Sequence, residues 1–457
     1  MITTLLEKQR AFFSSGQTET LSFRLKQLQN LADWIKKNEE DILAALHKDL
    51  GKAAFEGYAT EIAIVLDEIK YARKHLAKWV KDRRLSSPIK QFPSKCFCRP
   101  GPYGKVLIMS AWNYPFQLSI VPLVGAIAAG NTAVIKPSEL SAASSRLISR
   151  MIGECYSEEY VAVYEGGVKE SQELLGHKFD YIFFTGSVAV GKMIMAAAAN
   201  FLTPLTLELG GKSPCIVDET ADVLLSARRI SWGKFLNAGQ TCVAPDYLLV
   251  HHTVKDALVK AIKECITKFY GAEPLKSPDY PKIINRKHFE RIQSLFSKGE
   301  IIAGGKIDED SLKIEPTILA VDLGSPAMAE EIFGPLLPII SYKNLEEARR
   351  VVESFPKPLA CYIFSRNKKT EEYLLNSLCF GGGCINDTVV HLSVSSMPFG
   401  GVGESGFGGY HGRASFDTFS HYKSILKKSL LLDLPLRYPP YKESSLRLLK
   451  ALTNNFI

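Results

Sequence analysis

The sequence has no apolar run that suits a membrane-spanning helix. Its most apolar stretch, residues 118–135, is interrupted by a proline, two glycines and an asparagine, whereas such a helix needs about 20 consecutive, predominantly apolar residues. Residues 1–10 mix polar and apolar side chains and lack the long apolar core and the small-residue cleavage site of a secretory signal. We therefore expect a cytoplasmic protein without a stable membrane anchor.

A strong excess of one charge is also missing. The chain has 56 Lys and Arg against 48 Asp and Glu, a net charge of +8, and the basic residues occur in short runs such as 81–84. A nucleic-acid-binding surface would need a basic stripe interleaved with aromatic side chains, which the sequence does not contain. We interpret the runs as solvated faces and expect no nucleic-acid partner.

Cysteines at disulfide or metal-site spacing are missing as well. The nine cysteines are odd in number and scattered, which fits a reducing compartment better than a disulfide framework. The pairs Cys96 with Cys98 and Cys379 with Cys384 have no partner Cys or His pair at zinc-site spacing. We expect free structural thiols and no metal site.

The sequence does contain the patterns of several domains. At 457 residues with 46% hydrophobic side chains, the chain exceeds the size at which one core keeps growing, so two or three domains are expected. Apolar residues recur at helical spacing through residues 54–80, which predicts an amphipathic helix. Residues 86–104 carry four prolines between alternating segments, a pattern typical of edge strands and turns. We expect a boundary or an arm there.

Short apolar runs bounded by turn residues follow, and helix-length segments separate them. This alternation predicts a parallel sheet covered by helices, and a second series after Gly210 predicts a second α/β domain. Residues 444–457 have the pattern of a short amphipathic helix. The expected strands are residues 105–109, 132–135, 160–164 and 181–184 in the first series and 247–250, 359–364 and 383–385 in the second.

Cys242 is a candidate nucleophile. It follows Gly239-Gln240-Thr241, after a helical segment and before the strand that begins near Tyr247, so we expect it on a loop. The thiolate is the reactive form, and a thiol with a pKa of about 8.5 is mostly protonated at neutral pH, so a base or a positive field must assist. Taken alone, a single cysteine in a reducing compartment is more often a packing residue.

Glu208 and Asn113 are candidates for assisting groups. Glu208 lies in the apolar strand 205–209, and a carboxylate partly removed from water has a raised pKa and can act as a general base. The alternative is an outward-facing side chain on an edge strand. Asn113 follows a strand, where its amide could donate to a developing oxyanion or form an ordinary Asx turn.

The signals for a cofactor are weaker. Residues 183–191 run from a strand through a glycine turn into an alanine-rich helix, whose first N–H groups can face a pyrophosphate. The Gly-x-Gly-x-x-Gly pattern is absent from this segment. Lys136 and Glu139 lie just beyond a strand end, where ligands of open parallel sheets gather, but Lys-Pro-Ser-Glu is also simply a good helix start.

At these residues the sequence resembles the aldehyde dehydrogenase superfamily. The resemblance extends from the first helices to about Ile425, and its motifs occur in the family's order. The last motif, residues 397–412, is similar to the class 3 branch, whose members lack the long N-terminal extension of tetrameric relatives and are typically dimeric. The other motifs are Ala111-Trp112-Asn113-Tyr114-Pro115, residues 130–139, Phe184-Thr185-Gly186-Ser187, Leu207-Glu208-Leu209-Gly210-Gly211-Lys212, Gly239-Gln240-Thr241-Cys242 and Glu331-Ile332-Phe333-Gly334-Pro335.

The resemblance implies a role for each candidate. Cys242 becomes the nucleophile, Glu208 the base that activates the hydrolytic water, and Asn113 with the backbone N–H of Cys242 the oxyanion hole. The implied cofactor-binding residues are Lys136 and Glu139 at the adenosine ribose, Gly186 and Ser187 near the pyrophosphate, Glu331 and Phe333 at the nicotinamide ribose, and Leu209.

The resemblance also implies a fold of three parts and a C-terminal tail. We expect an α/β protein with a Rossmann-like dinucleotide-binding domain, an α/β catalytic domain, a small β bridging arm used in oligomerisation, and a C-terminal tail. The expected boundaries are 1–84 with 104–208 for the dinucleotide-binding domain, 209–412 for the catalytic domain, 85–103 with 413–440 for the arm, and 441–457 for the tail.

The implied reaction is the NAD(P)-dependent oxidation of an aldehyde to a carboxylic acid. We expect NAD to be favoured because a carboxylate at Glu139 accepts hydrogen bonds from ribose hydroxyls and repels a 2′-phosphate. NADP is a second candidate, since class 3 relatives often accept both cofactors. We expect no hydrophobic membrane tail of the kind found in some class 3 members that act on fatty aldehydes, and we expect a homodimer.

Two other functions stay open. An acylating dehydrogenase would pass the acyl group to coenzyme A instead of water, and the presence of Glu208 argues against it. A non-catalytic scaffold that kept the fold would be expected to lose active-site groups, whereas Cys242, Glu208 and Asn113 are all present. Loop shape decides which aldehyde enters, and the sequence does not specify it.

Overall fold

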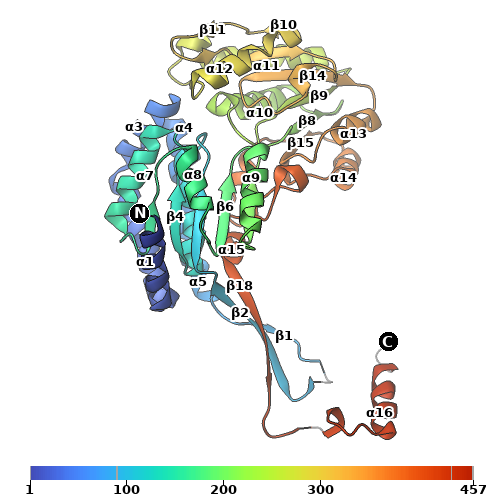
Figure 1. Ribbon diagram of the computed structural model, residues 1–457. Helices are drawn as coiled ribbons and strands as arrows, with labels where there is room; N and C mark the ends of the chain where they lie inside the picture. Colours follow the sequence, from blue (N-terminus) through green and yellow to red (C-terminus); the bar gives the residue numbers. More distant parts are fainter. Residues whose placement is uncertain (1, 89–90, 434, 455–457) are drawn as a thin grey trace. The chain divides into compact units, whose positions relative to one another are not determined.

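The computed structural model describes residues 2–88, 91–433 and 435–454 (Figure 1). The chain divides into two compact units. The first combines Met1–Trp79 with Pro102–His421, and the second combines Val80–Gly101 with Tyr422–Ile457. All candidate site residues belong to the first unit, which contains two large sheets.

The first of these sheets has six strands in the order β17-β7-β6-β3-β4-β5. Strands β3 to β7 are parallel, as the sequence pattern predicts, and β17 pairs antiparallel with β7. One face packs on apolar side chains of α1, α8 and α9, and α6 contacts β3 and β4. The strands are β3 (Lys105–Met109), β4 (Thr132–Lys136), β5 (Val161–Val163), β6 (Tyr181–Thr185), β7 (Leu205–Glu208) and β17 (Gly406–Phe407).

Helix α6 (Pro115–Ala129) accounts for the most apolar stretch of the sequence. Every residue of this helix is buried, and a helix that is apolar on all sides is typical of a protein core. No helix of the described residues is long and apolar enough to cross a membrane. The other helices that pack around the first sheet are α1 (Ile2–Ser14), α2 (Leu21–Lys37), α3 (Glu39–Leu50), α7 (Ala142–Cys155), α8 (Val168–Leu175), α9 (Val188–Ala199) and α15 (Gly412–Thr418).

The helix predicted over residues 54–80 is present, but it is not uniform. It consists of α4 (Ala54–Gly57), a π-helical turn (Tyr58–Ile62) and α5 (Ala63–Trp79). The apolar stripe of α5 is buried as expected. The π-helical turn could not be predicted from apolar spacing, and turns of this kind are frequent at functional sites. Here it carries the buried residue Glu61.

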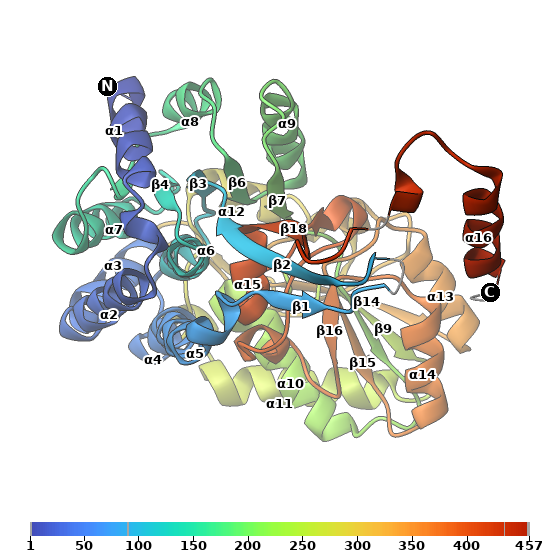
Figure 2. The same cartoon turned by 90° about the horizontal axis from the view of Figure 1, so that it is seen from below.

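The second sheet has seven strands in the order β10-β13-β14-β9-β8-β15-β16, all parallel except β10. It confirms the predicted second α/β series. Helices α10 and α11 lie side by side, as do α13 and α14 (Figure 2). The elements are β8 (Pro214–Val217), α10 (Val223–Phe235), β9 (Tyr247–His251), α11 (Lys255–Tyr270), α12 (Arg286–Gln293), β10 (Glu300–Ala303), β13 (Thr317–Ala320), β14 (Leu336–Tyr342), α13 (Leu345–Glu353), β15 (Ala360–Phe364), α14 (Lys368–Ser377) and β16 (Gly382–Ile385), with a small ribbon of β11 (Ile307–Asp308) and β12 (Lys313–Ile314).

The second unit is a three-stranded sheet, β1-β2-β18, followed by a helix. Residues 86–104, of which 89–90 lie outside the described residues, contain a strand as expected, but this strand, β2, lies between β1 and β18, so the expectation of edge strands there is wrong. Arg99 donates to both carboxylate oxygens of Asp82, at 2.8 and 2.9 Å, across this sheet. The elements are β1 (Arg83–Leu85), β2 (Ser94–Pro102), β18 (Ser420–Lys428) and α16 (Glu443–Asn454), which covers the described part of the predicted terminal helix.

The predicted boundaries within the first unit stay predictions, and two elements differ from them. β17 lies inside the range 209–412, yet it pairs with β7 of the first sheet. α15 lies in the range assigned to the arm, yet it packs on α6 and belongs to the first unit, which extends to His421. Both are short segments whose contacts are remote in sequence, so a local pattern could not assign them.

A buried ion pair joins the π-helical turn to the start of α6. Lys52 and Glu61 are both fully buried, and Lys52 Nζ lies 2.6 Å from Glu61 Oε1. Glu61 Oε2 accepts hydrogen bonds from the backbone N–H groups of Phe116 at 2.9 Å and Gln117 at 3.1 Å. Because the first N–H groups of a helix have no partner within the helix, this carboxylate caps α6.

We predict that Lys52→Met destabilises the protein by about 3–5 kcal/mol, because it leaves the Glu61 carboxylate buried without its partner. Lys52→Met with Glu61→Gln should recover part of that loss, since glutamine remains an acceptor for the start of α6. Lys276→Met is the control, because Lys276 pairs with Glu273 at the surface and should leave stability nearly unchanged. Chemical denaturation measures all three variants, and equal losses for Lys52→Met and Lys276→Met would contradict this account.

Candidate active site

Most candidate residues of the first sheet gather at the carboxyl ends of its strands. Met109 of β3 lies beside Lys136 of β4 and Phe184 of β6. Thr185 of β6 lies beside Glu208 of β7. The four strands therefore end level, at the edge where open α/β sheets bind ligands. The candidates that come directly after these strands are Asn113, Glu139, Gly186, Ser187 and Leu209.

Cys242 lies on the predicted loop between α10 and β9. Gln240 anchors this loop from a buried position. Its Nε2 donates to the backbone carbonyls of Asn237 and Lys282, each at 3.0 Å, and its Oε1 accepts from the N–H of Ile284 at 3.0 Å. Because both N–H groups and the oxygen of this amide form hydrogen bonds, they fix the backbone of Gln240, two residues before Cys242.

The turn that carries Asn113 is bonded to the loop that carries Cys242. Asn113 is buried, and its Nδ2 donates to the carbonyl of Gln240 at 3.1 Å. The hydroxyls of Tyr114 and Thr241 lie 2.6 Å apart. Two successive residues of the β3–α6 turn thus contact the two residues that precede Cys242. One N–H of the Asn113 amide remains for a further acceptor.

Glu208 is an interior residue, so the alternative of an outward-facing side chain is wrong. It ends β7 and is buried, and Gly406 of β17 lies opposite it. Neither carboxylate oxygen has a hydrogen-bond partner among the described residues. Burial raises the pKa of this carboxyl well above its usual range. A buried carboxyl without partners is expensive to keep, and groups of this kind concentrate at functional sites.

The thiol of Cys242 is half-buried in a negative environment. Burial raises its pKa to about 12, and the charges of Glu331 and Glu208 add to the rise. The backbone N–H groups of Cys242 and Val243 oppose it. The thiol is therefore protonated at neutral pH in this state, and its use as a nucleophile requires that a nearby base take the proton.

Glu331 and Phe333 reach the same region from the second half of the first unit. A Cβ on Gly210 would lie 2.0 Å from a Glu331 carboxylate oxygen, so only glycine allows this approach. Burial and the charge of Asp246 raise the pKa of Glu331 to about 8. The backbone hydrogen bond from Gly211 and the positive charges of Lys212 and Arg291 act in the opposite direction. The Phe333 ring packs edge-on to Trp112, with 5.3 Å between ring centroids.

Asp246 holds the segment that carries Glu331. Its Oδ1 accepts from the backbone N–H of Ile332 at 2.9 Å, and its other oxygen pairs with the buried ammonium of Lys212. A Cβ on Gly239 would lie 2.2 Å from the carbonyl oxygen of Gly334. The 331–334 segment therefore touches the cysteine loop, and the structure brings the Glu331 and Cys242 segments together.

Lys136 and Glu139 form a pair beyond β4. Lys136 is buried, and its Nζ donates to the Pro137 carbonyl at 2.8 Å and lies 3.8 Å from Glu139 Oε2. Burial lowers the pKa of Lys136, although Glu139 and other carboxylates oppose the change. Glu139 is exposed. An ammonium with N–H donors to spare beside an exposed carboxylate offers both donors and acceptors for sugar hydroxyls.

Gly186 and Ser187 form the turn between β6 and α9. Ser187 caps α9, since its Oγ accepts from the backbone N–H of Val190 at 3.4 Å. The buried Thr185 hydroxyl beside this turn has no partner among the described residues. Leu209 is buried against α9, where a Cβ on Gly191 would lie 2.7 Å from its side chain. The start of α9 thus fits a bound pyrophosphate.

The structure also reveals polar residues that the sequence pattern did not single out. Asn237 lies two residues before the Gly239-Gln240-Thr241-Cys242 motif, and its left-handed backbone could have been suspected because asparagine precedes Ala-Gly there. Lys52, Glu56 and Glu61 gave no signal, because their contacts with residues 113–117 and 237 are remote in sequence.

Comparisons with known proteins agree with this arrangement. The model of the aldehyde dehydrogenase family matches residues 4–425. The 4,4'-diaponeurosporen-aldehyde dehydrogenase of Staphylococcus aureus is 51% identical over 98% of this chain and 98% of its own. Aldehyde dehydrogenase family 3 member B1 of Rattus norvegicus is 46% identical over 97% and 96% of the two chains. The dimeric NADP-preferring aldehyde dehydrogenase of Canis lupus familiaris is 46% identical over 96% and 98%.

The fold comparison leads to the same family. A solved structure described as the substrate-bound state of Staphylococcus aureus AldH superposes with a TM-score of 0.97 at 50% identity, over 99% of each chain. The predicted fold class and the predicted resemblance, including its class 3 branch, are thereby confirmed. The chain belongs to the aldehyde dehydrogenase family and is an oxidoreductase that oxidises aldehydes with NAD(P).

Proposed function

We propose that this protein oxidises its aldehyde through a thioester on Cys242, which water then hydrolyses to the carboxylic acid. The observation that carries the proposal is the hydrogen bonding that joins the Asn113 turn to the Cys242 loop. These bonds support the proposal because they link the turn with the Asn113 amide donor to the two residues that precede the Cys242 thiol. The buried, unpartnered carboxyl of Glu208 supplies the third group that such chemistry needs.

In the first half-reaction, the Cys242 thiol gives its proton to a nearby base, its sulfur forms a bond to the aldehyde carbon, and the carbonyl oxygen becomes an oxyanion. The remaining N–H of the Asn113 amide and the backbone N–H of Cys242 stabilise this charge. When NAD(P) is bound, its nicotinamide ring accepts the hydride that leaves the substrate carbon. Loss of this hydride and return of the oxygen lone pair convert the adduct into a thioester on Cys242.

In the second half-reaction, Glu208 takes a proton from water as the water oxygen attacks the thioester carbon. The carbon–sulfur bond then breaks, the acid is released, and the proton returns to the sulfur of Cys242. A carboxylate is a useful base near neutral pH when burial has raised its pKa, which is the situation of Glu208. An acylating enzyme, in which coenzyme A takes the acyl group, would have less use for this residue.

The cofactor residues are proposed from the same geometry. Lys136 and Glu139 would hold the adenosine ribose, and Gly186 and Ser187 the pyrophosphate at the start of α9. Glu331 and Phe333 would hold the nicotinamide ribose, and Leu209 the adjoining wall. We further propose a homodimer, because a relative at 46% identity is named dimeric, and 4,4'-diaponeurosporen-aldehyde as the first substrate to assay, because the Staphylococcus relative is named for it.

The direct test of this mechanism separates the two half-reactions. Glu208→Gln keeps the shape of the side chain and removes the base, so mixing with aldehyde and NAD should give a burst of about one NADH per active site, then very slow turnover. Mass spectrometry should find the acyl group on the peptide that contains Cys242. Glu331→Gln is the contrasting variant, expected to weaken NAD binding without accumulating acyl-enzyme.

Two outcomes of that experiment would change the assignment of Glu208. A folded Glu208→Gln variant that binds NAD but shows no burst would mean that Glu208 also deprotonates Cys242. Unchanged steady turnover would remove Glu208 from the mechanism, and acyl-CoA formation in the presence of coenzyme A would favour the acylating alternative.

The choice of cofactor gives a further prediction. The exposed carboxylate of Glu139 should repel a 2′-phosphate, so we expect a higher kcat/KM with NAD than with NADP. Glu139→Gln should shift the ratio toward NADP by about tenfold. Glu173→Gln makes the same charge change on α8 and should leave the ratio unchanged. If kcat/KM for NADP exceeds that for NAD in the parent protein, the argument from Glu139 is wrong.

A further inference from the structure

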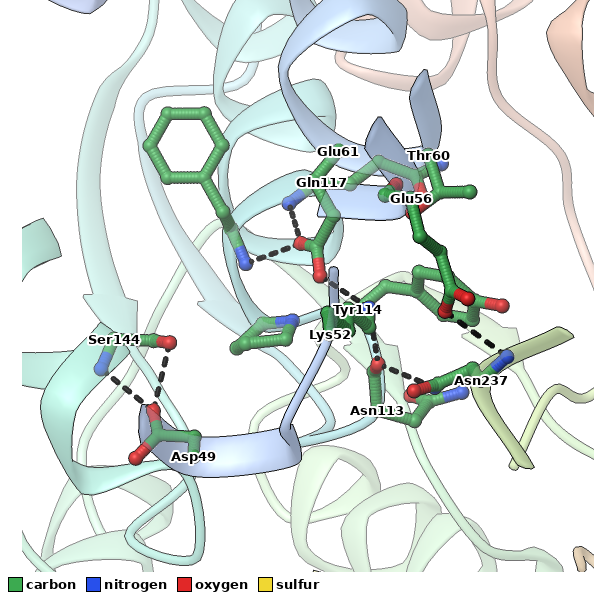
Figure 3. A network of polar contacts seen from close by, with 12 residues as sticks. Asp49, Lys52, Glu56, Thr60, Glu61, Asn113, Tyr114, Gln117, Ser144 and Asn237 are labelled. Carbon is green, nitrogen blue, oxygen red and sulfur yellow. Dashed lines mark hydrogen bonds and ion pairs between the residues drawn. The ribbon is translucent and has the colours of Figure 1, made fainter. Parts of the chain in front are cut away.

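The backbone carbonyl of Asn113 is held from two sides. It accepts a hydrogen bond from Lys52 Nζ at 3.0 Å and another from Asn237 Nδ2 at 2.8 Å. Figure 3 shows Lys52 and Asn237 converging on this oxygen. Both lone pairs of the carbonyl are therefore used, which fixes the backbone from which the Asn113 side chain projects.

The Asn237 amide also spans the gap between the two loops of the candidate active site. The same Nδ2 that donates to Asn113 donates to the carbonyl of Gln240 at 3.1 Å. Gln240 in turn accepts from the Asn113 side chain. The buried NH2 group of Asn237 thus bonds both the turn that carries Asn113 and the loop that leads to Cys242. Its two acceptors are backbone carbonyls, not the Asn113 amide or the Cys242 thiol.

The backbone of Asn237 is held in a conformation that few residues adopt. Asn237 and Ala238 both have a φ of 52°, which is unfavourable for residues other than glycine and is tolerated best by asparagine and aspartate. The N–H of Asn237 donates to Glu56 Oε1 at 3.0 Å, and its carbonyl accepts from Gln240 Nε2 at 3.0 Å. Strained segments persist where their surroundings over-determine them, and Glu56 supplies part of that support (Figure 3).

We propose that Asn237 is a positioning residue, and that Glu56 supports it: together they set the geometry between the Asn113 amide and the Cys242 thiol. The proposal rests on the roles given above to Asn113 and Cys242. The oxyanion exists only after the sulfur attacks, so a displaced donor should lower kcat and leave cofactor binding intact. A displacement of about 1 Å can cost about 100-fold in rate.

The first variant is Asn237→Asp, which keeps the shape and tolerates the backbone angle. It replaces the NH2 donor by an oxygen that faces two carbonyl oxygens. We expect kcat to fall by about 100-fold, with the Kd for NAD within about twofold of the parent. Hydrogen exchange in the peptide that contains residues 236–243 should become faster, because the hydrogen bonds that close the loop are lost.

Asn131→Asp is the matched control. Asn131 is also a buried amide whose Nδ2 donates to two backbone carbonyls, those of Ala126 at 3.2 Å and Phe419 at 2.9 Å. It precedes β4, at the end of the sheet away from Cys242. The same change in atoms should lower Tm in a comparable way and leave kcat within about threefold of the parent.

Glu56 provides a second, milder pair of variants. Glu56→Ala removes the acceptor of the Asn237 N–H, whereas Glu56→Gln restores an acceptor without the charge. Because Glu56 is only half-buried, both variants are expected to fold. We expect kcat about tenfold lower for the alanine variant and near the parent for the glutamine variant. If Glu56 had a purely structural role, the variants would change Tm without this difference in kcat between alanine and glutamine.

The outcomes separate this proposal from the proposed function. Folded Asn237→Asp and Glu56→Ala variants with kcat within threefold of the parent would overturn it, as would an equal loss of kcat in Asn131→Asp. If Asn237→Asp does not fold, the Glu56 pair decides. If the parent oxidises no aldehyde, hydrogen exchange in the peptide that contains residues 236–243 decides. Faster exchange in Asn237→Asp would support the positioning role and leave only the proposed reaction contradicted. Unchanged exchange would overturn both proposals.

Discussion

The parallel register of the first sheet is the constraint on which the site depends. Because Met109 pairs with both Lys136 and Phe184, and Thr185 with Glu208, four strands end at one level. The residues that follow these strands therefore lie at a single edge of the sheet, and no long loops are needed to bring them there. Backbone hydrogen bonds of the sheet, and not the side chains of the site, set these positions to within one residue, since a slip of one residue would turn each side chain to the other face.

The polar side chains at this edge are arranged at an electrostatic cost. Burial raises the pKa values of Cys242, Glu208 and Glu331, and the charges of Glu331 and Glu208 add to the rise at the Cys242 thiol. At the low effective dielectric of such a site, like charges cannot all be present at once. The thiol and the two carboxyls therefore all favour their protonated forms. This is the condition under which a small rearrangement can transfer a proton from sulfur to oxygen.

The cost is balanced by hydrogen bonds to the backbone around the reacting groups. Gln240 and Asn237 bind main-chain atoms of the cysteine loop, and Lys52 binds the main chain of the Asn113 turn. None of these contacts uses the Cys242 thiol or the second N–H of the Asn113 amide, which remains for substrate. A rigid backbone that leaves one amide N–H free for the oxyanion is the combination that electrostatic preorganisation requires.

Much of the fold could be predicted from the sequence, because buried parallel strands are short apolar runs that turn residues delimit. The loop position of Cys242 followed from the same pattern. The burial of Glu208 could not be derived, since it depends on Gly406 of β17, which is remote in sequence. The pair of Lys52 and Glu61 was also missed, because Lys52 precedes the predicted helix over residues 54–80, Glu61 lies within it, and neither position gives a sign of a partner at residues 113–117.

The central claim is that Cys242 forms the covalent bond to substrate, and Cys242→Ala tests it most directly. The assay is aldehyde-dependent formation of NADH, with the melting temperature and NAD affinity measured on the same sample. The account predicts that activity falls by several orders of magnitude while both other quantities stay at parental values, since a loop thiol adds little to the core. Activity within tenfold of the parent would contradict it.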